Sequence, residues 1–151
     1  MQVGVISDTH GLLRPEAVAA LANSELILHA GDIGNPEVLA ELEAIAPVVA
    51  VRGNNDTDEW AKAIAERQTL KIEDVSVHIL HIGREFNLFE TTGVQVVISG
   101  HSHKPSIVEN HGILFLNPGS AGPRRFKLPI SVAHLRVEGK AVHAEIVELA
   151  V

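Results

Sequence analysis

The sequence predicts a mixed α/β fold in which two β-sheets lie together and helices cover the outside. In the first half, apolar strand-like runs alternate with helix-like segments, which is typical of parallel strands joined by crossover helices. From Gln68 onward, short strands follow one another and are separated by turn pairs such as Glu73-Asp74 and His111-Gly112. A length of 151 residues with 46% hydrophobic content suits one globular domain, so we expect a single domain over residues 1–151.

The first half is expected to contain buried strands and two well-marked helices. Runs of β-branched and apolar residues predict strands at residues 3–7, 26–30 and 48–51. Pro15 stands in the first turn of a helix expected over residues 15–22, where its missing N–H is not needed. Asn35 is the expected N-cap of a second helix, with Pro36 at its first position and apolar residues at helical spacing up to residue 46.

A third helix and a series of strands are expected after the third strand. Asp58 is the candidate N-cap of a helix that ends near Arg67. Strands are then expected at residues 68–72, 75–81, 94–99, 106–110, 113–117, 130–137 and 142–148. Residues 84–92 fit a short helix or a loop, and both interpretations stay open at this point.

Composition and charge exclude several classes of function. The chain has no cysteine, so a metal here must be bound by oxygen and nitrogen ligands. The formal net charge is -7 and the only basic cluster is Arg124, Arg125 and Lys127, which disfavours nucleic-acid binding through a basic face. Adjacent arginines in a polar loop are usually solvated, so they are left out of the expected site. No apolar run approaches the ~20 residues that span a bilayer, and a cytoplasmic protein is expected.

Metal-binding side chains follow the expected buried strands in order along the chain. These seven residues are Asp8, His10, Asp32, Asn54, His81, His101 and His103. Ligands of open α/β sheets bind in the crevice at the carboxyl ends of the strands, so side chains presented there can meet at one site. Carboxylate and imidazole groups together are typical ligands of divalent transition metals. The sequence therefore predicts a metal site at this edge.

The order of these blocks resembles the signature of the calcineurin-like metallophosphoesterases. The matching blocks are Asp8-Thr9-His10, Gly31-Asp32, Gly53-Asn54, His81 and Gly100-His101-Ser102-His103. The short chain, Asn55 after the Gly-Asn pair, and the later Asn117-Pro118-Gly119-Ser120 are similar to the small prokaryotic phosphodiesterase branch, the YfcE/Vps29-like proteins. The resemblance implies a two-sheet metallophosphoesterase sandwich with flanking helices, in four layers α/β/β/α. The chain departs from the family at His81-Ile82-Gly83, where histidine, glycine and histidine are usual.

The resemblance also implies two divalent ions and a distribution of ligands. One ion would be held by Asp8, His10, Asp32 and His103, and the other by Asp32, Asn54, His81 and His101, with Asp32 bridging. Oxygen and nitrogen ligands favour Mn²⁺, and Fe, Ni, Co and Zn are the alternatives.

The implied function is hydrolysis of small phosphodiesters, including nucleotide-like ones, by in-line attack of a metal-bridging hydroxide. Asp32, Asn54, Asn55 and His81 are the expected catalytic residues. Asn55 stands where larger relatives have a histidine, and an amide cannot release a proton at neutral pH, so esters with good leaving groups are the expected substrates. The alternative is a Vps29-like protein-binding scaffold with vestigial hydrolase activity, which the full set of motif residues disfavours. Symmetry preferences alone leave a homodimer open.

Overall fold

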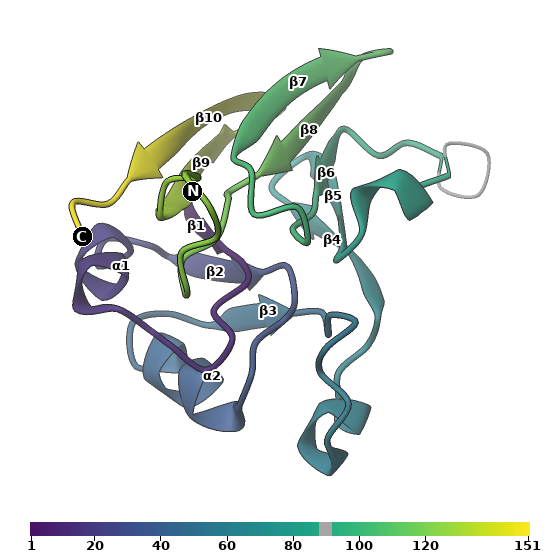
Figure 1. The fold of residues 1–151 in the computed structure, drawn as a ribbon. Helices are drawn as coiled ribbons and strands as arrows, with labels where there is room; N and C mark the ends of the chain where they lie inside the picture. Colours follow the sequence, from purple (N-terminus) through teal and green to yellow (C-terminus); the bar gives the residue numbers. More distant parts are fainter. Residues whose placement is uncertain (88–91) are drawn as a thin grey trace.

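The first of two facing β-sheets carries most of the candidate metal ligands. The structure is a computed structural model that describes residues 1–87 and 92–151. The strand order of this sheet is β10-β9-β1-β2-β3 (Figure 1). Its strands are β1 (Gln2–Ile6), β2 (Leu26–His29), β3 (Val48–Ala50), β9 (Ser131–Glu138) and β10 (Ala141–Glu148). The first three are parallel, and β9 runs antiparallel to β1. The carboxyl ends of β1, β2 and β3 therefore meet at one edge.

The second sheet supplies the remaining candidate ligands. Its order is β4-β5-β6-β8-β7. Its strands are β4 (Arg67–Ile72), β5 (Val75–Leu80), β6 (Val96–Ile98), β7 (Ser106–Asn110) and β8 (Ile113–Asn117). Strands β5, β6 and β8 are parallel, so β5 and β6 end on the same side as each other. The two-sheet fold expected from the sequence is confirmed, and both sheets are mixed.

Apolar side chains of the two sheets pack against each other and form the main core. Val5, Leu28, Val77, Ile98 and Leu135 are each fully buried in it. Burying one such side chain contributes about 1.5–3 kcal/mol, so this interface fixes the two sheets relative to each other. The loops at their shared edge are thereby held in place.

Helices cover the outer face of the first sheet. These are α1 (Pro15–Ala20) and α2 (Pro36–Glu43), whose buried faces pack with the outward side chains of β1 and β2. Asn35 caps α2 as expected, because its Oδ1 accepts a hydrogen bond from the Val38 N–H at 3.1 Å. In the described part of the chain, no helix is long and apolar enough to cross a membrane.

The prediction of a helix from Asp58 to about Arg67 is wrong. A short 3-10 helix, η1 (Glu59–Ala63), stands there, and Asp58 makes no side-chain cap. Ile64 then turns to an extended backbone, and the Arg52 N–H donates to the Ala65 carbonyl at 3.0 Å. This long-range hydrogen bond draws the chain into β4 and outweighs the local helical pattern.

Residues 84–92, for which both a short helix and a loop were expected, begin as a short helix. They contain the end of the 3-10 helix η2 (Gly83–Glu85), and residues 88–91 lie outside the described residues. Phe86 packs with Leu80 and Val97 on the outer face of the second sheet. Among the described residues, η2 is the only helix on this side, so this outer layer is thinner than the one over the first sheet.

Candidate metal centre

Five of the seven candidate ligands have a left-handed backbone. The φ angles are 55° at Asp8, 46° at His10, 54° at Asp32, 71° at His101 and 63° at His103. Residues with a Cβ rarely adopt these angles, because the side chain then crowds its own backbone. Such conformations gather at functional sites, where surrounding contacts hold them. The loops after β1, β2 and β6 each turn sharply and aim these side chains at one point.

Asp8 lies at the centre of the cluster and is fully buried. Its Oδ2 accepts hydrogen bonds from the Ser7 hydroxyl at 2.7 Å and the His101 N–H at 3.1 Å. Its Oδ1 lies 3.7 Å from His10 Nε2, 3.8 Å from His81 Nε2 and 3.4 Å from His103 Nε2. Burial alone would raise the pKa of Asp8, but the nearby imidazoles of His10 and His103 and the charge of His81 hold it well below its usual value. The carboxylate is therefore ionised at neutral pH.

Asp32 is the second buried carboxylate, and it lies between two histidines. Its Oδ2 is 3.2 Å from His81 Nε2 and 3.7 Å from His10 Nε2. Asn55 donates to it twice, from its backbone N–H to Oδ1 at 2.9 Å and from its side-chain amide to Oδ2 at 3.0 Å. Burial raises the pKa of Asp32, but the imidazole of His81 beside it and the backbone hydrogen bond from Asn55 outweigh this effect and lower the pKa. Asn55 therefore orients Asp32.

His81 has its tautomer set by the end of β2. Its Nδ1 donates to the Ala30 carbonyl at 2.7 Å, which leaves the lone pair on Nε2. Nε2 faces Asp8 and Asp32 (3.8 and 3.2 Å) and is buried without a hydrogen-bond partner. Burial lowers the pKa of His81, but the Asp32 carboxylate 3.2 Å from Nε2 and the charge of Asp8 together raise the pKa by more. A backbone carbonyl behind the imidazole is the usual arrangement of a metal-binding histidine.

His10 and His103 face each other beside Asp8. Their Nε2 atoms are 3.4 Å apart, and their ring centroids are 5.4 Å apart. The Asp8 carboxylate 3.7 Å away raises the pKa of His10, and the charge of Arg125 partly opposes this rise. Two imidazole nitrogens this close to each other and to Asp8 Oδ1 suit a shared cation.

Two groups of side chains in the described part of the chain could hold an ion. They are Asp8 with His10 and His103, and Asp8 with Asp32 and His81, and the ligand atoms of each group lie within 4.8 Å of one another. Asp8 belongs to both groups, whereas the family resemblance implied that Asp32 is the shared ligand. In the structure both carboxylates lie between the histidines, since Asp32 Oδ2 also faces His10 and His81.

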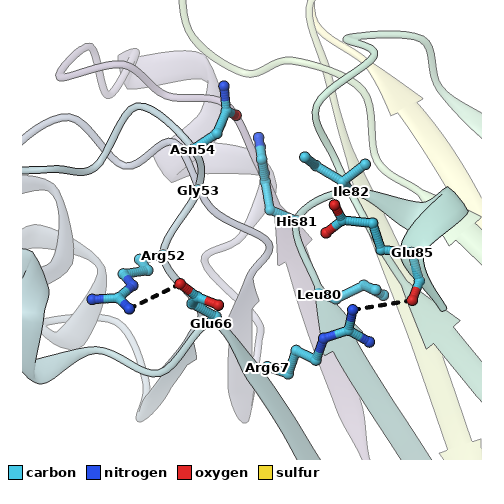
Figure 2. A pocket seen from close by; sticks show the side chains of 9 residues that line it. All are labelled: Arg52, Gly53, Asn54, Glu66, Arg67, Leu80, His81, Ile82 and Glu85. Carbon is cyan, nitrogen blue, oxygen red and sulfur yellow. Dashed lines mark hydrogen bonds and ion pairs between the residues drawn. The ribbon is translucent and has the colours of Figure 1, made fainter.

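The other two candidate ligands lie at the edge of the cluster. The His101 ring contacts the His81 ring edge to face, with centroids 5.2 Å apart. Asn54 is exposed and lines a cavity of about 300 Å³ beside His81 (Figure 2). At the other end of this cavity, Arg52 pairs with Glu66 at 3.0 Å and Arg67 donates to the Glu85 carbonyl at 3.0 Å. Both arginines are thus partly engaged.

Unpartnered buried atoms test whether a cation fits this centre. Asp8 Oδ1 and His81 Nε2 are buried, face each other across the site and have no hydrogen-bond partner. Buried polar atoms in folded proteins are almost always bonded, and an exception commonly marks a ligand or ion site. An anionic oxygen facing imidazole lone pairs is the chemistry that a divalent ion satisfies. The side chains of Asp8 and His81 therefore suit a divalent metal ion.

The glycines of the motifs are required by close contacts with the carboxylates. A Cβ on Gly53 would lie 2.1 Å from Asp32 Oδ1. A Cβ on Gly100 would lie 2.0 Å from the Ser7 hydroxyl and 2.7 Å from Asp8 Oδ2. Only glycine lets these backbones approach the two carboxylates.

Two buried residues outside the ligand set hold the loops together. His29 Nδ1 accepts from the Gly31 N–H at 3.1 Å, and its Nε2 lies 3.0 Å from the Thr9 hydroxyl. Burial lowers the pKa of His29 to about 4, so the ring is neutral. Asp56 accepts hydrogen bonds from the N–H groups of Ile33, Gly34 and Gly53.

Arg125, which the sequence left outside the expected site, has a charge that lowers the pKa of His10. The two residues are far apart along the chain, so no local spacing or motif could have indicated this effect.

The chain matches known phosphoesterases over most of its length. The model of the calcineurin-like phosphoesterase superfamily domain matches residues 1–140. A probable metallophosphoesterase from Methanothermobacter thermautotrophicus is 41% identical, with 97% of this chain and 92% of that protein covered. A phosphodiesterase from Methanocaldococcus jannaschii is 33% identical, with 79% of this chain and 83% of that protein covered. The solved structure of a Vps29 single mutant from Entamoeba histolytica has a TM-score of 0.80 at 22% identity, covering 98% of this chain and 99% of that one.

Proposed function

Since the chain belongs to the calcineurin-like phosphoesterase superfamily, we propose that it is a dinuclear metal-dependent phosphodiesterase acting on small phosphodiesters. The observation that carries the proposal is Asp8 Oδ1, a buried and unpartnered carboxylate oxygen that faces three imidazole nitrogens at 3.4–3.8 Å.

The residues that would hold the ions are those of the family pattern. Asp8, His10, Asp32 and His103 would hold one ion, and Asp32, Asn54, His81 and His101 the other. Oxygen and nitrogen ligands favour Mn²⁺, with Fe, Ni, Co and Zn as alternatives. When bound, two such ions supply an activated water and neutralise charge on the phosphoryl group.

The chain's own residues prepare this site for an anionic ester. Asp8 and Asp32 are ionised at neutral pH because their pKa values lie below the usual range. The Ala30 carbonyl keeps the lone pair of His81 on the Nε2 that faces both carboxylates. Asn55 directs both its backbone and its side-chain N–H donors to Asp32, so it positions that carboxylate and supplies no proton to a leaving group.

Two features favour diesters with good leaving groups. No acid side chain stands at the Asn55 position, so a leaving group must depart as a stable anion or take its proton from water. The cavity of about 300 Å³ beside His81 and Asn54 has room for one ester group of a small substrate.

A protein-binding scaffold is the competing function. The likeness to Vps29 at 22% identity concerns the fold alone. A scaffold has no use for buried, unpartnered ligand atoms, which destabilise the folded chain unless a cation binds them. This favours the enzyme.

Hydrolysis of bis-para-nitrophenyl phosphate by metal-stripped protein titrated with Mn²⁺ tests the proposal. We expect turnover that depends on metal and falls by at least about 100-fold in Asp32→Asn. The matched control is Asp74→Asn, a surface residue in the β4–β5 turn, which should behave as wild type. Absence of turnover with each of Mn²⁺, Fe²⁺, Ni²⁺, Co²⁺ and Zn²⁺ would contradict the proposal and favour the scaffold.

A further inference from the structure

We propose that the segment Arg125–Lys127, at the rim of the candidate metal centre, recognises phosphodiesters that carry an aromatic base. In this inference Arg125 contacts the phosphate and Phe126 stacks on the base. It rests on the proposed function and adds a substrate class to it, nucleoside phosphodiesters.

The loop between β8 and β9 is anchored directly to the chain that carries Asp8. The Ser120 hydroxyl donates to the Asp8 carbonyl at 3.1 Å, and the Ala121 N–H donates to the Ser7 carbonyl at 3.1 Å. Gly122 is so close that a Cβ there would lie 2.2 Å from the Thr9 carbonyl oxygen. Figure 1 shows this loop running beside the segment that leaves β1. Arg125 follows only three residues after this anchor.

Arg125 is a cation without a partner, three residues after the point where the loop contacts Thr9. No described residue forms a hydrogen bond or an ion pair with its guanidinium. The neighbouring Arg124 differs, because its guanidinium donates to the carbonyls of Leu128 at 3.3 Å and Val151 at 3.5 Å. A free guanidinium at the rim of an anion site matches the geometry of a phosphate.

Phe126 is presented to solvent by a strained turn. Its side chain is 88% exposed, the largest exposure among the large apolar residues described, and its φ is 54°. The turn is closed by the Leu128 N–H, which donates to the Arg125 carbonyl at 3.1 Å. Holding the backbone of a residue with a Cβ in the left-handed region costs free energy, and such conformations gather at binding sites.

A nucleoside ester satisfies both groups together. Its phosphate is the anion that the metal centre and Arg125 attract, and its base offers the flat face on which an exposed phenyl ring stacks. Lys127 adds a further positive charge to the same short turn and favours an anionic ligand over a neutral aromatic one.

The test compares two esters with one leaving group. These are para-nitrophenyl thymidine 5′-phosphate and methyl para-nitrophenyl phosphate, which differ in the nucleoside. We expect wild-type protein loaded with Mn²⁺ to favour the nucleoside ester by about tenfold in kcat/KM, mainly through KM. Phe126→Ala should lose this preference while it hydrolyses the methyl ester normally, and Phe126→Trp should keep the preference.

Adjacent arginines provide the matched control for the phosphate contact. Arg125→Gln should raise KM for both esters by about tenfold, whereas Arg124→Gln, which removes the same charge one residue away, should leave KM unchanged. Equal effects of the two variants, or a base preference that survives Phe126→Ala, would overturn the inference. Failure of wild-type protein to hydrolyse either ester would instead contradict the proposed function itself.

A binding measurement that needs no hydrolysis tests the stacking of the base on residue 126 independently of the proposed enzymatic function. In Phe126→Trp loaded with Zn²⁺, thymidine 5′-monophosphate should quench the added tryptophan, and ribose 5-phosphate should not. Wild-type protein, with Trp60 alone, gives the background signal. No quenching beyond that background would contradict stacking.

Discussion

Asn55 binds Asp32 through two N–H donors, at 2.9 Å from the backbone and 3.0 Å from the side-chain amide. The sequence suggested only that Asn55 replaces an acid–base histidine. The structure adds a positioning role, because the two bonds fix both oxygens of a carboxylate that faces His10 and His81. The amide thus stabilises the ionised form of Asp32.

Asn55→Ala is expected to weaken metal binding. The variant removes the side-chain bond to Asp32 Oδ2 and leaves the backbone bond intact. Loss of such an outer partner typically lowers metal affinity by about 10- to 100-fold. Calorimetric titration of metal-stripped protein with Mn²⁺ measures the effect, with the exposed Asn110→Ala as control. Unchanged affinity would show that the amide contact has no positioning role.

Asn55→His is expected to change the response to leaving-group pKa. An imidazole at this position supplies a general acid, so esters of poorer leaving groups should gain rate relative to the para-nitrophenyl ester. The dependence of log kcat on leaving-group pKa, measured over a series of aryl methyl phosphates, should become shallower. Equal slopes of this plot for wild type and variant would argue against the explanation that the enzyme lacks a general acid because Asn55 stands at this position.

His81→Ala is expected to reduce the bound metal from two ions to one per chain. Its Nε2 is an unpartnered buried ligand atom directed at both carboxylates. His78→Ala is the matched control, because His78 lies three residues earlier, contacts Thr69 at 2.7 Å and packs against Phe86 away from the site. Metal content after dialysis, measured by mass spectrometry, should be unchanged in that control. Two ions in His81→Ala would remove this residue from the ligand set.

The stability of metal-stripped protein is expected to depend on His29 between pH 6.5 and 4. Burial lowers its pKa to about 4 in the folded chain, against about 6.5 unfolded. The unfolded chain then binds more protons in this window, so His29 makes stability fall as pH falls, by roughly 3 kcal/mol in total. The contribution is fully present above pH 6.5.

The comparison with His29→Asn isolates this effect. Denaturant unfolding from pH 7 to 4 should show a smaller loss of stability in the variant than in wild type, because the other titrating groups are shared. The Asn side chain also offers an acceptor to the Gly31 N–H, which His29 Nδ1 binds at 3.1 Å. Identical pH profiles would mean that His29 is not held neutral.

Local sequence patterns predicted the strands and the strand-end positions of the candidate ligands. The apolar run before Asp8, for example, is β1, and Asn35 caps α2 as its position suggested. The prediction of a helix after Asp58 was wrong, because a long-range hydrogen bond between Arg52 and Ala65 outweighs the local helical pattern of apolar residues. Long-range packing likewise gave Asp8 a place in both groups of candidate ligands. Such contacts depend on the folded chain and have no local signal.

Anomalous X-ray diffraction from crystals of the protein grown with Mn²⁺ tests the central claim most directly. The account expects two anomalous peaks in each chain, with Asp32 in contact with both, His10 and His103 beside one, and His81 beside the other. A single peak, or peaks away from Asp8 and Asp32, would contradict a dinuclear centre at this site.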